Sequence, residues 1–280
     1  MSEQLLSSVE MANFVTNGFL RFDAIIPEHL NKAVLAEITS DKIAGVRYNN
    51  QHQSFSEYFN TSPAFAAVLD LPPVQRLINS LVGHHPTIDH CAVHRVFANT
   101  KHGQFWHADA TIDPRTEAFD IQIFYFPHDT PLEAGGTLFL PGSHFRHVHE
   151  SSIARYQNLK GQLHVVCPAG SIFAVHHGLW HCGQPNRTNN DRYMLKLRLN
   201  PTVHQGRLFD TTDLDHERIP HILSTYLAWP GAEARLEILQ RLRLWRFVTQ
   251  SKFDVDLWLS RLENQPQPCE TMAAPALAHR

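Results

Sequence analysis

The chain has 280 residues, of which 43% are hydrophobic and 18% are charged, so it is long enough and apolar enough to bury a sizeable core. Its formal net charge of −3 gives no electrostatic basis for general nucleic-acid binding, and no apolar run is long enough to cross a bilayer. The N-terminus lacks the basic start and apolar stretch of a secretory signal. The cysteines lack disulfide-framework or CxxC spacing, so we expect a cytoplasmic protein; they are Cys91, Cys167, Cys182 and Cys269.

The chain opens with helical patterns. Residues 8–38 predict a helix, a short extended piece (GFLRF) and a second helix, PEHLNKAVLAEI, with proline at its start. Residues 54–82 also look helical, with breaks at Pro63 and at Pro72-Pro73. We therefore expect a helical layer ahead of whatever follows.

The pattern of apolar residues changes between about residues 87 and 200. Short apolar runs are separated there by Gly, Pro, Asp and Asn, which is typical of an antiparallel barrel or sandwich. The runs are CAVHRVFA, DIQIFYF, GTLFLPG, QLHVVCP, SIFAVHH and YMLKLRLNP. This is a mainly β core with flanking helices.

Helical periodicity returns after the β region. Residues 231–263 predict a helix, with Leu236, Leu239, Leu242 and Trp245 at helical spacing. We expect one domain over 1–265, with its β core at about 87–200 and a helical extension at about 205–263. Residues 266–280 are expected to be a disordered tail.

The segment FWHADA, residues 105–110, places His107 and Asp109 two positions apart. On a strand, such residues point to the same face. A third metal ligand is offered by AVHHGLWHCGQPN, which contains His176, His177 and His181. Two histidines and one carboxylate at the mouth of a barrel form the ligand set of non-haem Fe(II) oxygenases, which leaves coordination positions open. The simpler interpretation of the His107–Asp109 pair alone is structural.

Arg192 strengthens the metal-site hypothesis. Strand alternation places Arg192, Met194, Lys196 and Arg198 on one face, with Tyr193 and three leucines on the other. We expect the leucine face to pack on helices and the cationic face to point into the barrel; the alternative is a solvated cationic face. A planar guanidinium can hold the far carboxylate of 2-oxoglutarate while the other end chelates iron.

Several fragments in a fixed order carry a family resemblance. They are FVTNGFLRFDAIIPEHLNKAVLAEI, HAD, EAGGTLFLPGSH, CPAGSIFAVHHGLWHCGQPNRT and Arg192. Over roughly residues 8–200 the sequence resembles the phytanoyl-CoA dioxygenase family of Fe(II)/2-oxoglutarate oxygenases. The resemblance implies a double-stranded β-helix (jelly-roll, cupin-like) core. It also implies His107, Asp109 and His181 as iron ligands, Arg192 as the 2-oxoglutarate anchor, and O2 as a co-substrate.

The sequence departs from the family pattern at the co-substrate pocket. Phe124 stands where the family often has tryptophan, and Gln122 lies on the same face as a hydrogen-bond donor candidate. Gly183 replaces a serine found in some members. His144, in PGSH, is interpreted as a residue that fixes its loop, because the ligand triad is complete without it.

The presence of Asp109 favours hydroxylation over halogenation, although the same triad can also desaturate or epimerise. The expected substrate is a small metabolite or natural-product intermediate. No Lys/Arg cluster suited to the phosphates of CoA stands out. The alternatives are a zinc hydrolase, in which Arg192 would have no required role, and a non-catalytic binding module, which would not need a complete ligand set. No nucleic-acid or membrane partner is expected, and the C-terminal helices are a candidate homodimer face.

Overall fold

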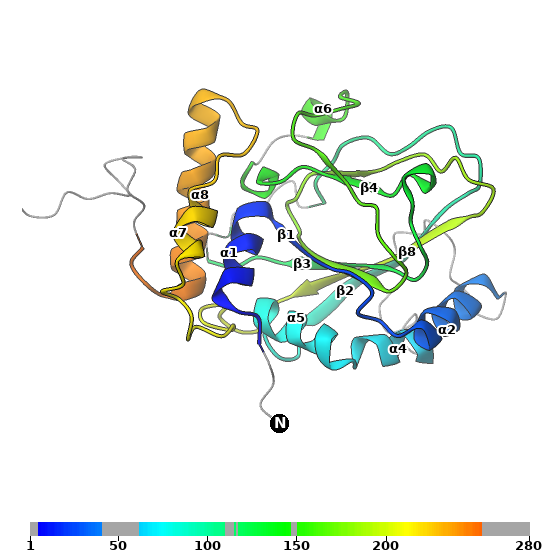
Figure 1. Cartoon of the computed structure of the whole chain (residues 1–280), viewed down its shortest axis with the longest axis horizontal. Coiled ribbons are helices and arrows are strands. Elements are labelled where there is room, and N and C mark those ends of the chain that lie inside the picture. Colours follow the sequence, from blue (N-terminus) through cyan, green and yellow to red (C-terminus); the bar gives the residue numbers. More distant parts are fainter. Residues whose placement is uncertain (1–4, 41–61, 110–114, 116, 147–149, 254–280) are drawn as a thin grey trace, which may run out of the picture.

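Two antiparallel sheets form the centre of a computed structural model, which describes residues 5–40, 62–109, 115, 117–146 and 150–253 (Figure 1). The larger sheet has the order β1 (Phe19–Phe22), β6 (Ser171–His176), β3 (Ile121–Phe126), β8 (Arg192–Asn200) and β2 (Thr87–Val96). The smaller sheet has the order β5 (Leu163–His164), β4 (Thr137–Phe139) and β7 (His181–Gly183). The predicted antiparallel β core is confirmed.

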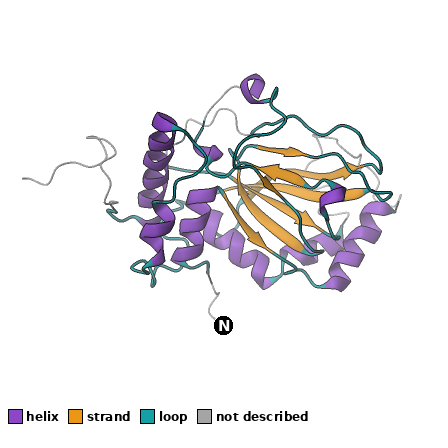
Figure 2. Cartoon of the chain, turned by 45° about the horizontal axis from the view of Figure 1, so that its top comes forward, coloured by secondary structure: helices purple, strands orange, loops and turns teal. Residues whose placement is uncertain are grey.

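Helices lie along one side of the sheets and at one end (Figure 2). They are α1 (Ser8–Asn17), α2 (Glu28–Thr39), α4 (Pro63–Leu69), α5 (Pro72–Val82), α7 (Arg218–Leu223) and α8 (Gly231–Thr249). The short helix α6 (Glu150–Ile153) lies apart from them, across the sheets from α2, α4 and α5 (Figure 1). Two 3-10 turns are η1 (Leu132–Ala134) and η2 (Ser143–Phe145). Two of the predicted breaks, Pro63 and Pro72, are the first residues of α4 and α5, where a missing N–H costs nothing. Residues 54–61 lie outside the described residues. No described helix is both long and apolar enough to span a membrane.

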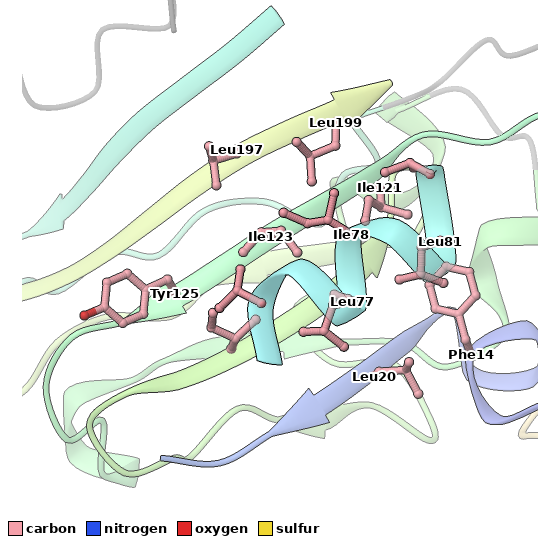
Figure 3. Packing of buried hydrophobic residues seen from close by; sticks show 14 of the residues in the cluster. Phe14, Leu20, Leu77, Ile78, Leu81, Ile121, Ile123, Tyr125, Leu197 and Leu199 are labelled. Atoms are coloured by element: carbon pink, nitrogen blue, oxygen red, sulfur yellow. The ribbon is translucent and has the colours of Figure 1, made fainter. Parts of the chain in front are cut away.

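The outer face of the larger sheet packs on these helices. Tyr193, Leu195, Leu197 and Leu199 of β8 are buried in the same cluster as the apolar face of α5. Figure 3 shows Leu77, Ile78 and Leu81 of α5 over the strands, beside Ile121 and Leu199. This confirms the predicted leucine face, and it leaves the opposite face of β8 for the space between the sheets.

Aromatic rings fill part of the space between the two sheets. Phe139 of the smaller sheet lies 5.7 Å from the Phe124 ring and 5.8 Å from the Phe173 ring of the larger one. The remainder of that space is a cavity lined by the cationic face of β8. Cys182 lies in a separate buried cluster with Trp106 and Leu138, which agrees with its interpretation as a core residue.

Three details differ from expectation. Helix α8 ends at Thr249 rather than 263, since Gln250 adopts a left-handed conformation with φ of 54°; residues 254–263 lie outside the described residues. Its buried stripe also differs, because Leu236 is 48% exposed whereas Ile238 is buried. The segment FWHADA is not a regular strand: His107 forms a single isolated bridge to His181.

Candidate metal centre

The two candidate ligand histidines are brought together by the backbone. The N–H of His107 donates to the carbonyl of His181 (3.1 Å), and the N–H of His181 donates back (2.8 Å). This pairing places the imidazole rings 4.4 Å apart, centroid to centroid. The isolated bridge, rather than a regular strand, therefore aligns the two histidines.

Both imidazoles are held in one tautomer. Nδ1 of His107 lies 2.8 Å from the carbonyl of Phe105, and Nδ1 of His181 lies 2.9 Å from the carbonyl of Leu179. Because a carbonyl can only accept, each Nδ1 carries the proton and each Nε2 keeps its lone pair. Burial lowers the pKa of His181 to about 3, so its ring stays neutral. A neutral imidazole with a fixed Nε2 is the form that binds a metal.

Asp109 completes a group of three potential ligands. Its Oδ1 lies 3.8 Å from Nε2 of His107, and its Oδ2 lies 3.4 Å from Nε2 of His181. One ligand atom from each of the three residues lies within 4.8 Å of the others. The structure therefore brings together the three residues that the sequence singled out, His107, Asp109 and His181.

The other two histidines of the distal segment lie outside this group. The ring of His176 faces Phe14 and Phe119 on the helical side, at 6.3 and 5.5 Å. His177 lines the cavity, and its backbone N–H donates to the carbonyl of Asp120. His144 donates from Nε2 to the carbonyl of Val15 (3.2 Å), which agrees with a loop-fixing role.

Oδ2 of Asp109 has two further partners, which sequence reasoning did not pair with it. Gln122 donates to it from Nε2 (2.6 Å), and the Lys196 ammonium donates to it as well. Burial alone would raise the pKa of Asp109, but the charge of Lys196 and its hydrogen bond to the carboxylate outweigh burial and hold that pKa well below its usual range. Asp109 is therefore a carboxylate, with Oδ2 engaged by the protein.

Phe124 lines the cavity beside this group. Its ring meets the His181 ring edge-on at 5.5 Å, and the Lys196 nitrogen lies 5.3 Å from its centroid. An ammonium over an aromatic face is an attractive arrangement. Phe124 thus positions both a ligand and the lysine that contacts Asp109.

Arg192 is only 5% exposed and points into the same cavity. Its Nη1 donates to the carbonyls of Ala134 (2.5 Å) and Gln184 (3.1 Å). Burial lowers the pKa of this guanidinium to about 10, and no carboxylate pairs with it among the described residues. A buried cation with only neutral partners is a ready partner for an anionic ligand.

Gly135 explains part of the EAGGTLF fragment. Its φ is 86°, and a Cβ there would lie 2.2 Å from the Pro185 carbonyl oxygen and 2.9 Å from Nη1 of Arg192. Only glycine lets this loop come so close to the guanidinium. The glycine in this fragment thus allows the loop to pack closely against the Arg192 guanidinium.

The cavity measures about 570 Å³ and is lined by residues of both sheets. Three buried polar atoms on its wall lack a hydrogen-bond partner within the described part of the chain: Nε2 of His94, Oε1 of Gln122 and Nε2 of His177. Buried polar groups are normally satisfied, so these atoms indicate that a ligand or water completes the site. Sequence reasoning missed His94, although its even spacing from His90 on β2, the strand that pairs with β8, could have indicated a shared face.

The donor set fits a divalent transition metal. Two imidazole nitrogens and one carboxylate oxygen converge at the wall of the cavity, and this ligand set is the one found in non-haem Fe(II) sites with open coordination positions. The partnerless Arg192 in the same cavity fits a second, carboxylate-bearing ligand.

Comparisons with known proteins agree with this picture. The family model "Phytanoyl-CoA dioxygenase (PhyH)" matches residues 18–194. No curated protein matches the chain at a significant level.

Solved structures share the jelly-roll fold. The chain is similar to the non-heme alpha ketoglutarate dependent carbocyclase SnoK from nogalamycin biosynthesis (TM-score 0.57, 17% identity, covering 76% of this chain and 90% of that one). It is also similar to EctD from S. alaskensis, solved with 2-oxoglutarate and 5-hydroxyectoine (0.58, 18%, 73% and 79%). A third similar structure is HygX from Streptomyces hygroscopicus with nickel and 2-oxoglutarate bound (0.57, 16%, 71% and 88%). At these identities the likeness establishes the fold, a double-stranded β-helix.

Proposed function

The chain belongs to the phytanoyl-CoA dioxygenase (PhyH) family, and we propose that it is an Fe(II)- and 2-oxoglutarate-dependent dioxygenase that hydroxylates a small molecule. The observation that carries the proposal is the composition of one cavity. A two-histidine, one-carboxylate group and a buried guanidinium without a carboxylate partner among the described residues line the same space. A zinc hydrolase would need the first feature but not the second.

Each residue of the cavity has a role in this proposal. Iron and 2-oxoglutarate, when bound, supply the oxidising chemistry, in which O2 and 2-oxoglutarate are converted into succinate and CO2 while one oxygen atom enters the substrate. His107, His181 and Asp109 would hold the metal through nitrogen and oxygen atoms that already converge. Arg192 would hold the far carboxylate of 2-oxoglutarate with its planar fork. Phe124 would exclude water from the side of His181.

Gln122 has a different role from the one expected of a co-substrate donor. Its Nε2 is committed to Asp109, so its Oε1 is left as an acceptor on the cavity wall. Oε1 of Gln122 and Nε2 of His177 both belong to residues of the cavity wall and lack partners among the described residues, so we propose that the primary substrate presents a hydroxyl or amino group to this wall. A cavity of about 570 Å³ suits a small metabolite or natural-product intermediate.

The reaction type needs a product measurement. SnoK is a carbocyclase, so succinate formation alone does not distinguish hydroxylation from other outcomes of this chemistry. Hydroxylation adds one oxygen atom from O2 to the substrate, whereas cyclisation removes two hydrogens. Mass spectrometry of the product formed under ¹⁸O2 separates them.

The test is a metabolite-library screen scored by Fe(II)-dependent succinate formation. We expect activity in the wild-type protein and its loss in Asp109→Ala, because the variant loses a ligand and a negative charge together. Asp109→Glu should also be poor, since an added methylene displaces the ligating oxygen. Asp89→Ala is the matched control, because Asp89 pairs with Arg198 outside the ligand group. Product formation by Asp109→Ala at the wild-type rate would overturn the proposal.

A further inference from the structure

Lys196 is a buried cation placed directly beside the candidate metal ligands. It lies on the inner face of β8, between Arg192 and Arg198, and is 5% exposed. Its ammonium contacts Oδ2 of Asp109, and the ring of Phe124 supports it at 5.3 Å. The protein thus keeps a positive charge on the carboxylate that a metal ion would bind.

Two other cations of this wall have carboxylate partners outside the ligand group, whereas Arg192 contacts only backbone carbonyls among the described residues. Arg198 pairs with Asp89, and Arg95 pairs with Asp191 (Nε to Oδ2, 2.6 Å). Lys196 differs, because its ion-pair partner among the described residues is Asp109 itself. A divalent cation in the His107–Asp109–His181 group would therefore share one carboxylate with an ammonium.

We propose that Lys196 makes metal binding depend on an anionic ligand. In the free protein the ammonium competes with the divalent cation for Asp109, and like charges at this distance repel each other strongly in a buried site. A dicarboxylate that enters the cavity offsets the excess positive charge of the metal, Lys196 and Arg192 together. The inference rests on the proposed function for the identity of the metal and the dicarboxylate.

Linkage makes the effect reciprocal. If 2-oxoglutarate strengthens metal binding by a given factor, the metal strengthens 2-oxoglutarate binding by the same factor. Chelation supplies one part of this factor in any such enzyme, and Lys196 supplies a second part here. The free protein would then bind the metal weakly until the co-substrate is present. This limits the amount of protein that holds metal without co-substrate.

The variant Lys196→Met removes the charge and keeps the length of the side chain. Two effects of opposite sign are expected. The metal-free variant should unfold at a lower temperature than the wild type, because Asp109 loses its ion-pair partner in a buried site. Its affinity for Mn(II) should instead rise by about tenfold or more, since a repelling charge next to the ion is gone. A purely structural lysine would not produce this second effect.

The experiment is a calorimetric titration with Mn(II), without and with saturating 2-oxoglutarate, alongside thermal unfolding of the metal-free protein. In Lys196→Met the enhancement of Mn(II) affinity by 2-oxoglutarate should be smaller than in the wild type by about the same tenfold factor. Arg198→Met is the matched control, because Arg198 lies two residues after Lys196 on the same face of β8 but pairs with Asp89. The Mn(II) affinity of this variant should differ from that of the wild type by less than about threefold. Lys196→Gln, which keeps a hydrogen-bond donor for Asp109, should behave like the methionine variant and serves if that variant does not fold.

The outcomes separate the two proposals. Unchanged Mn(II) affinity in both Lys196 variants, or an unchanged enhancement by 2-oxoglutarate, overturns the role of Lys196. A third arm uses His181→Ala: if that variant binds Mn(II) as the wild type does, the ligand group and with it the proposed function fail, whatever Lys196 does.

Discussion

Arg192 offers the sharpest test of how the co-substrate is held. We predict that Arg192→Met leaves Mn(II) binding intact and weakens 2-oxoglutarate binding. Removing one partner of a buried, hydrogen-bonded charge pair costs about 2–5 kcal/mol. At 1.4 kcal/mol per factor of ten, this is a loss of roughly thirtyfold to a few thousandfold in affinity. Arg192→Lys should recover only part of the loss, because an ammonium cannot form the bidentate fork.

The structure also defines what else this substitution removes. The carbonyls of Ala134 and Gln184 each lose a donor, and an unsatisfied buried carbonyl costs about 1–3 kcal/mol of stability. Methionine is chosen over alanine because it keeps most of the volume. Unfolding by urea should confirm that the variant is folded before binding is measured.

The assay is a titration of 2-oxoglutarate into Mn(II)-loaded protein without O2. Arg95→Met is the control, because Arg95 also lines the cavity but pairs with Asp191, and its 2-oxoglutarate affinity should stay within about threefold of the wild type. If folded, Mn(II)-loaded Arg192→Met binds 2-oxoglutarate as tightly as the wild type, the guanidinium does not hold the co-substrate and the reasoning is refuted.

Three further predictions follow from the geometry. His181→Ala should abolish Mn(II) binding in a calorimetric titration. His176→Ala should retain it, because the His176 ring faces Phe119 instead. The reverse result would mean that the ligand is misassigned. Arg241→Met should lower the free energy of unfolding in urea by about 3–5 kcal/mol, because the buried Glu237, whose pKa burial already raises to about 7, loses its ion-pair partner. Arg243→Met on the exposed side of α8 should change it by less than about 0.5 kcal/mol, and equal effects would contradict the argument. Burial raises the pKa of Cys91 and Cys182 to about 12 and of Cys167 to about 11, so these thiols stay protonated below pH 10. Peptide mapping after iodoacetamide treatment at pH 8 should therefore find all three unmodified in the native protein and modified after unfolding. Rapid labelling of the native protein would show that they are accessible thiolates.

The parts of the fold that were predictable from sequence depend on local patterns. Alternation along YMLKLRLNP assigned both faces of β8 correctly, because this strand lies between β3 and β2 and has helices on one face only. Proline fixed the starts of α4 and α5 for an equally local reason. The end of α8 was missed since neither glycine nor proline follows Thr249; Gln250 itself adopts the left-handed conformation.

The candidate site was predictable in its residue types but not in its contacts. The spacing of His107 and Asp109 would suit a strand, yet an isolated bridge to His181 aligns them, and only tertiary pairing creates that bridge. The contact between Lys196 and Asp109 depends on how a loop residue meets a strand far along the chain. Alternation placed Lys196 on the correct face, but nothing local indicated its partner.

The first strand has a consequence for how the chain must be made and handled. Among the described strands, β1 lies at the edge of its sheet and pairs with β6 alone, and Phe19 pairs with Val175. The larger sheet therefore cannot close until most of the polypeptide has left the ribosome, and such long-range pairing is slow to form. A truncation that removed residues 1–22 would strip β6 of this cover and present its unpaired N–H and C=O groups to other chains, which is the geometry that seeds edge-to-edge aggregation. A fusion tag should therefore be added ahead of these residues and should not replace them.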